Sequence, residues 1–117
     1  DQQKIALEFR HPTWFCKAVY DILNKYNVAL VYADCGQKWP QEWQETSDSF
    51  VYIRMHGPDG SYATKYKNDH LEEMAEKIEK LLKQDKEVYV YFNNDFNAYA
   101  IENALALKDL SATDRHR

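Results

Sequence analysis

The stretch from residue 49 to residue 57 constrains the fold most, because its side chains alternate strictly in character. Apolar and polar or phenolic side chains follow one another in the order Val51, Tyr52, Ile53, Arg54, Met55 and His56. A period of two predicts a β-strand with one buried face and one polar face. Gly57 and Pro58 come next and interrupt the strand, so we expect His56 at its C-terminal end.

Three further segments are predicted strands. Residues 4–10 and 87–92 alternate in the same way, with one apolar face and one face that carries polar or tyrosine side chains. Residues 28–34 are nearly all apolar up to Asp34, as expected for a central strand of a parallel sheet. The chain therefore contains four predicted strands.

Helices are predicted between and after these strands, where apolar residues recur at intervals of three and four. The first helix follows Thr13 as its N-cap and buries Phe15, Ala18, Val19, Ile22, Leu23 and Tyr26. The second buries Leu71, Met74, Ala75, Ile78, Leu81 and Leu82, and the last buries Ile101, Ala104, Leu105 and Leu107. Residues 35–48 lack such a pattern and are predicted to form a crossover loop.

The alternation of strands and helices predicts an α/β fold with parallel strands and crossover helices. In an open sheet covered on both sides, both strand faces would be apolar, but three of these four strands have a polar face. A barrel lumen explains that face, so we predict half of a TIM-type barrel with four strands and about three helices. Residues 1–110 would form this single domain, and residues 111–117 a frayed tail.

Length and charge limit the classes of protein further. The 117 residues are about half of what an eight-stranded α/β barrel needs. The formal net charge is −4 and the basic residues are scattered, which argues against general binding to nucleic acid or to membrane surfaces. The only cysteines are Cys16 and Cys35, and no apolar run approaches the ~20 residues of a membrane span. We expect a cytoplasmic protein.

Half of a barrel leaves two strands with unpaired edges, which proteins rarely tolerate. We therefore predict that the chain pairs with a second copy as a homodimer, or with a complementary half-barrel chain.

Polar side chains gather where the predicted strands end, which is where α/β barrels build their sites. They are Glu8, Arg10, His11, Asp34, Arg54, His56, Asn93 and Asn94. Guanidinium groups suit a phosphate or carboxylate, and we also predict that Trp14 and Tyr91 bind the ligand. We predict catalytic roles for Glu8, Asp34 and His56, with a carboxylate as base and the imidazole as acid or proton shuttle.

Two other interpretations stay open. Glu8 and Asp34 can simply neutralise Arg10 and Arg54 in a structural network of ion pairs with no substrate. Alternatively, Glu8, Asp34 and His56 can bind a divalent metal, as in isomerase- or endonuclease-type barrels. No local ligand motif such as paired histidines on a helix supports the metal, so the sequence predicts neither a metal nor a cofactor.

The same strand ends resemble a known family. Glu8 to Trp14, Ala33-Asp34, Tyr52 to Gly57, Tyr91 to Asp95 and Asn103-Ala104 are similar, in this order, to the C-terminal half of the YecE-like family, or domain of unknown function 72. The resemblance implies a TIM-type barrel of uncharacterised activity, whose polar centre includes Glu8, Arg10, Asp34, Arg54, His56, Asn93 and Asn94. The family's first half, with its own strands, is absent from this sequence.

Overall fold

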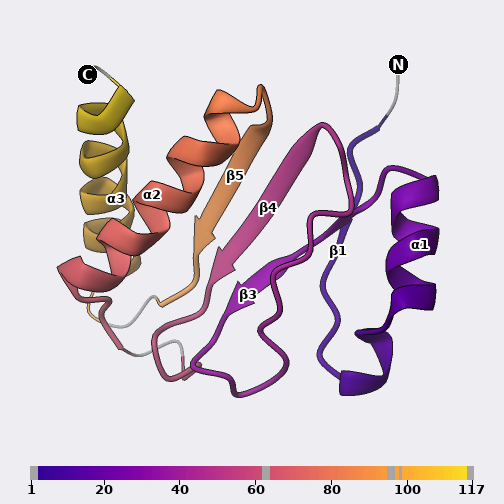
Figure 1. The fold of residues 1–117 in the computed structure, drawn as a ribbon. Helices are drawn as coiled ribbons and strands as arrows, with labels where there is room; N and C mark the ends of the chain where they lie inside the picture. The colour runs from indigo at the N-terminus through magenta and orange to yellow at the C-terminus, as the bar shows by residue number, and fades with distance from the viewer. Residues whose placement is uncertain (1–2, 62–63, 95–96, 98, 116–117) are drawn as a thin grey trace.

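A computed structural model describes residues 3–61, 64–94, 97 and 99–115, with side chains as far as residue 110 (Figure 1). Its elements, in chain order, are β1 (Ala6–Leu7), the 3-10 turn η1 (Pro12–Trp14), α1 (Lys17–Lys25), β2 (Ala29–Leu30), β3 (Tyr32–Asp34), β4 (Phe50–Met55), α2 (Asn68–Lys83), β5 (Glu87–Phe92) and α3 (Tyr99–Arg115). This is the predicted α/β order, and residues 35–48 cross over without a helix, as expected.

All of the strand pairs are parallel. β1 pairs with β2, and β4 lies between β3 and β5. The predicted strand at residues 28–34 is divided into β2 and β3 at Val31. It meets β1 along its first half and β4 along its second half, so the four predicted segments lie in the order of the sequence.

The division at Val31 has a local cause in the crossover loop. The Thr46 hydroxyl donates to Val28 O at 2.6 Å and accepts the Leu30 N–H at 2.9 Å. Thr46 thus supplies hydrogen-bond partners for backbone groups at β2. β4 does not supply them, because its pairing with this segment begins only at Tyr32 of β3.

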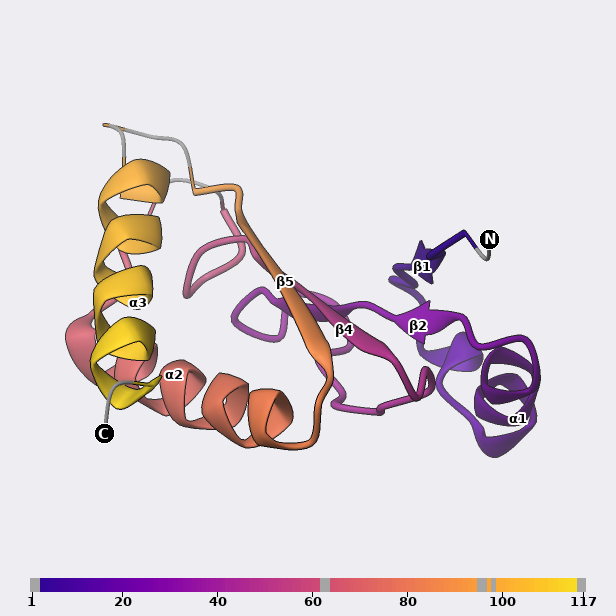
Figure 2. The ribbon, with the colours of Figure 1, turned by 90° about the horizontal axis from the view of Figure 1, so that it is seen from above.

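The core lies between the three-stranded sheet and helices α2 and α3, at the opposite end of the molecule from α1 (Figure 2). The predicted apolar face of β4 is buried there, with Ile53 and Met55 fully inaccessible to solvent. The second helix packs as predicted, because Leu71, Met74, Ala75, Ile78 and Leu81 are all buried and Leu82 is partly buried. β5 turns Val88, Val90 and Phe92 toward the same core.

The predicted buried face of the first helix is largely wrong. In α1 only Leu23 is buried, whereas Ile22 and Tyr26 are 58% and 67% exposed. Ala18 is exposed as well. The apolar stripe exists, but no described element of this chain covers its outer part.

The last helix differs from its prediction in the same way. α3 buries Ala100, Asn103 and Leu107, while Ile101 and Leu105 are 65% and 58% exposed. The helix continues to Arg115, into the segment predicted to fray, and residues 116–117 lie outside the described residues. Asp95 of the family-like motif also lies outside them.

Among the described residues, no helix combines the length and the apolar composition that crossing a membrane requires.

Candidate functional site

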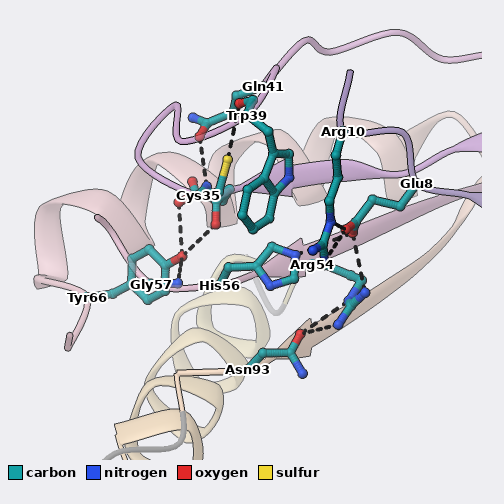
Figure 3. Close-up of polar contacts among 11 residues, drawn as sticks. Glu8, Arg10, Cys35, Trp39, Gln41, Arg54, His56, Gly57, Tyr66 and Asn93 are labelled. Carbon is teal, nitrogen blue, oxygen red and sulfur yellow. Dashed lines mark hydrogen bonds and ion pairs between the residues drawn. The ribbon is translucent and has the colours of Figure 1, made fainter. Parts of the chain in front are cut away.

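Glu8 is the centre of a cluster of polar contacts with Arg10, Arg54 and His56 (Figure 3). Its Oε2 accepts a hydrogen bond from Arg10 Nε at 3.0 Å, and its Oε1 lies 3.5 Å from Arg54 Nη1. The same Oε1 lies 3.3 Å from His56 Nε2. One carboxylate thus contacts two guanidinium groups and one imidazole.

The strand register explains how these residues meet. Arg54 lies on the polar face of β4, and its neighbour on β5 is Tyr91. Asn93 follows the end of β5, and its Oδ1 accepts from both Arg54 Nε (3.2 Å) and Arg54 Nη2 (3.0 Å). The Arg54 side chain is therefore held between Asn93 on one side and Glu8 on the other.

An aromatic residue of the crossover loop covers the cluster. The Trp39 ring lies 4.2 Å from the Arg10 guanidinium carbon, a cation–π contact. Trp39 also contacts His56. The two rings meet edge to face, with their centroids 5.1 Å apart. The loop is held in place by Gln41, whose Oε1 accepts from Cys35 N at 2.8 Å.

His56 is fully buried, which governs its protonation. Burial lowers the pKa of His56 below its ordinary value, and the Glu8 carboxylate opposes this effect only in part. His56 is therefore neutral at pH 7. With its proton on Nε2, it donates to Glu8 and leaves Nδ1 as the basic nitrogen.

Two cavities adjoin the cluster. The first has a volume of about 430 Å³ and is lined by Glu8 and Arg54 together with Tyr52, Tyr89, Tyr91 and residues farther along the strands. The second, of about 530 Å³, is lined by Arg10, Trp39, Lys38 and neighbouring loop residues. The charged cluster therefore lies between two spaces that a small ligand can enter.

The first cavity has an aromatic wall. The rings of Tyr52 and Tyr91 stack with centroids 5.2 Å apart, and Tyr52 and Tyr89 are 6.4 Å apart. These residues come from the polar faces that the sequence predicted for β4 and β5. The polar face of the half-barrel thus consists of a tyrosine surface next to the charged cluster.

The whole of residues 1–117 matches the family described as "Protein of unknown function DUF72". The chain belongs to the DUF72 family. A curated relative is the UPF0759 protein YunF of Bacillus subtilis, which is 26% identical over 128 residues, covering 90% of this chain and 45% of YunF.

Two crystal structures of DUF72 family proteins have the same fold. The protein from Thermotoga maritima superposes with a TM-score of 0.82 at 28% identity, covering 92% of this chain and 46% of that chain. The protein from Enterococcus faecalis gives a TM-score of 0.80 at 26% identity, covering 92% of this chain and 48% of that chain. This DUF72 chain therefore spans about half the length of the relatives it matches, as a half-barrel should.

Asp34 does not join the cluster in this DUF72 chain. It shares the face of β3 with Tyr32, toward α2, whereas the neighbouring Ala33 pairs with Arg54. The Asp34 carboxylate is 2% exposed and accepts from the Tyr66 hydroxyl at 2.9 Å and from His70 Nε2 at 2.6 Å. The predicted grouping of Asp34 with Glu8 and His56 is therefore wrong.

Three predicted ligand-binding residues, Asn94, His11 and Trp14, also make their contacts away from the Glu8 cluster. Asn94 is fully buried, and its Nδ2 donates to Thr64 O at 2.8 Å and to Asn103 Oδ1 at 2.9 Å. His11 accepts the N–H of Thr13 at 3.3 Å, so His11 caps the η1 turn, and Thr13 is not the N-cap of α1.

Trp14 stacks on Phe9 with ring centroids 4.7 Å apart. Neither Trp14 nor His11 lines either of the two cavities beside the cluster. Glu8, Arg10, Arg54, His56 and Asn93 do come together as predicted, with Tyr91 on the wall of the first cavity.

The sequence interpretation missed the part that Trp39 plays in the cluster. Residues 35–48 were predicted only to cross over between strands, although a tryptophan in a loop directly after a strand C-terminus is placed to cover a barrel site. Among the described residues, no three His, Cys, Asp or Glu side chains are grouped closely enough to hold a metal ion. The three side chains of the metal alternative do not meet, because the Asp34 carboxylate binds Tyr66 and His70 while that of Glu8 contacts His56.

Proposed function

We propose that this chain provides one wall of a binding site for a small anionic or polar ligand, at the C-terminal ends of its strands. A phosphate or carboxylate group is the chemistry that Arg10 and Arg54 would recognise, because guanidinium groups offer paired donors to such oxygens. Hydrolysis of that ligand is the candidate reaction.

The observation that carries the proposal is that each arginine of the cluster lines a cavity. Arg54 and Glu8 line the first, of about 430 Å³, and Arg10 lines the second, of about 530 Å³. Both guanidinium groups also contact the carboxylate of Glu8, which orients them. Each guanidinium is therefore placed to meet an anion that enters the cavity beside it.

Glu8 and His56 supply the acid–base chemistry in this proposal. Their contact at 3.3 Å allows a proton to pass between carboxylate and imidazole. A neutral imidazole is the form that can accept a proton, and the Arg54 guanidinium would stabilise negative charge that develops on the ligand.

The test is calorimetric titration of the protein with inorganic phosphate at low ionic strength. Arg54→Gln should weaken phosphate binding about tenfold, the typical worth of a charge-assisted hydrogen bond. The matched control is Lys83→Gln on α2, which removes the same charge from a side chain that is 73% exposed. This control should bind phosphate like the wild type.

The structural alternative makes the opposite prediction. If the cluster only holds the sheet together, phosphate does not bind the wild type, and Arg54→Gln lowers the melting temperature alone. The contacts of Arg54 with both Glu8 and Asn93 are what favour this second candidate.

We also propose that a second half-barrel closes this one, either as another copy or as a complementary chain. The support is apolar surface at both ends of the fold: Ile5, Leu7, Ile22 and Tyr26 at β1 and α1, and Ile101 and Leu105 on α3 are all more than 40% exposed. Burying these side chains against a partner would stabilise the assembly. Light scattering across a concentration range tests this, with a mass of two chains expected.

The cytoplasm remains our proposed location. Cys16 and Cys35 are both free thiols, as is usual in a reducing compartment. Fractionation of cells with an antibody to the chain is the direct test.

A further inference from the structure

Tyr66 lies outside the polar cluster but is bonded to the turn that carries His56. The Tyr66 side chain is 2% exposed, and its hydroxyl accepts the backbone N–H of Gly57 at 2.8 Å (Figure 3). The same hydroxyl donates to Asp34 Oδ1 at 2.9 Å, with Asp34 O at 3.2 Å. The phenol therefore joins the turn after β4 to the end of β3.

This arrangement fixes the backbone amides of His56 and of the next residue, Gly57. His56 N–H donates to Asp34 O at 2.8 Å, which extends the β3–β4 ladder past Met55. The next N–H, that of Gly57, is taken by Tyr66, which is itself bonded to Asp34. His56 can then present its ring to Glu8 at 3.3 Å, beneath Trp39.

Tyr66 is in turn fixed from two other elements. Asn103 of α3 holds its backbone on both sides, since Oδ1 accepts Tyr66 N–H at 2.9 Å and Nδ2 donates to Tyr66 O at 3.1 Å. His70 of α2 binds the second oxygen of Asp34 at 2.6 Å, which keeps that carboxylate oriented toward the phenol. The position of the hydroxyl is thus set by both helices that cover the sheet.

We infer that Tyr66 is a positioning residue, whose hydroxyl holds the His56–Gly57 turn so that the His56 ring stays buried against Glu8. The inference rests on the proposed function, because it assigns Tyr66 a role in the same anion site. Burial and the Asp34 carboxylate both raise the pKa of Tyr66. The hydroxyl therefore stays protonated, donates to Asp34 and accepts the Gly57 N–H.

The test compares Tyr66→Phe with Tyr32→Phe. Tyr32 is the matched control, because it is buried and its hydroxyl also takes part in a hydrogen bond, from Gln41 at 3.2 Å, whereas the Tyr66 hydroxyl bonds Asp34 and Gly57. The readouts are the titration of the His56 ring followed by NMR and the dissociation constant for inorganic phosphate.

Tyr66→Phe should raise the pKa of His56 toward its ordinary value, because a loosened turn admits water to the ring. Phosphate binding should weaken by about fivefold or more, the lower range of coupling between sites in proteins. Tyr32→Phe should change neither readout. An unchanged His56 titration in Tyr66→Phe would overturn the inference, even if the melting temperature falls.

Two results separate this inference from the proposed function. If the wild type binds no phosphate, the proposed function fails, but the His56 titration still decides whether Tyr66 positions the ring. If Tyr66→Phe does not fold, the test is instead the hydrogen exchange of the Gly57 amide in the wild type. Slow exchange supports the bond to Tyr66, and fast exchange contradicts it.

Discussion

His56 Nε2 and Glu8 Oε1 lie 3.3 Å apart, although 48 residues separate the two in the sequence. The contact forms because parallel strands bring their C-terminal ends to the same edge of the sheet. Arg54 reaches the same Glu8 oxygen from β4 at 3.5 Å. Glu8 is thus both the partner of the cations and the group that limits their attraction for an anion.

Glu8→Gln should have two effects of different sign. It should lower the free energy of unfolding by about 1–3 kcal/mol, because the buried His56 and the partly buried Arg54 lose a charged acceptor. It should also tighten phosphate binding, because the cluster then carries one more positive charge. Urea denaturation and calorimetry measure the two effects, with Glu79→Gln on α2 as the control. A loss of stability with no gain in phosphate affinity would favour the purely structural network.

Removal of His70 should change how stability depends on pH. The hydrogen bond with Asp34 raises the pKa of His70 above its ordinary value of 6.5, although burial opposes it. A raised folded-state pKa stabilises the protein fully below the unfolded-state pKa, and this stabilisation is lost as the pH rises through the folded-state pKa. The stability difference between the wild type and His70→Gln should therefore be largest below about pH 6 and shrink as the pH rises above the ordinary pKa of 6.5 and through the raised pKa of folded His70.

The pKa of His56 is lowered, so its protonation destabilises the fold at low pH, but this contribution is present in both proteins and cancels in the difference. Urea denaturation at a series of pH values gives the comparison. A difference that stays constant across the range would show that the His70–Asp34 contact is not an ion pair in solution.

Two leucines on the helices should differ sharply in the isolated chain. Leu71→Ala should lower the free energy of unfolding by about 2–5 kcal/mol, because Leu71 is fully buried in the core. Leu105→Ala on α3 should cost less than about 0.5 kcal/mol, because its side chain is 58% exposed. At concentrations where the proposed second half-barrel binds, the effect of Leu105→Ala should grow, because that partner would cover α3. A large effect in the isolated chain would contradict the exposure of Leu105.

Gly36→Ala should destabilise the loop that carries Trp39. Gly36 has a φ of +61°, and a Cβ there would lie 2.3 Å from Pro58 O and 2.7 Å from Asp59 Cα. The expected cost is about 1–3 kcal/mol, measured by urea denaturation. The comparison variant is Asp85→Gly, since Asp85 has a φ of +62° without being glycine. It should keep or slightly raise stability, and equal losses in both variants would contradict this explanation.

The polar face of the sheet was predictable from sequence, whereas the side of Asp34 was not. Alternation in residues 51–56 and 87–92 shows directly which side chains share a face, so Arg54 and Tyr91 were assigned correctly. Residues 28–33 show no such alternation of apolar and polar side chains, so the face of Asp34 could not be assigned from the pattern. Asp34 follows Tyr32 by two positions and therefore faces α2, where His70 binds it.

The helices at the two ends of the fold were mispredicted for a different reason. Periodicity identifies the apolar stripe of a helix, but it does not reveal whether anything covers that stripe. Ile22 and Ile101 are apolar and correctly spaced, yet both are mostly exposed in the chain as described. The chain spans about half of the length of the relatives it matches, which supports our proposal that a second half-barrel covers these stripes.

The most direct test of the proposed anion site is an NMR titration of the wild-type protein with inorganic phosphate, followed residue by residue. We expect saturable shifts concentrated at Glu8, Arg54, His56 and Asn93, with little change on the outer face of α2. If these residues show no saturable shifts, or if shifts are spread over the surface lysines, the proposed anion site is contradicted.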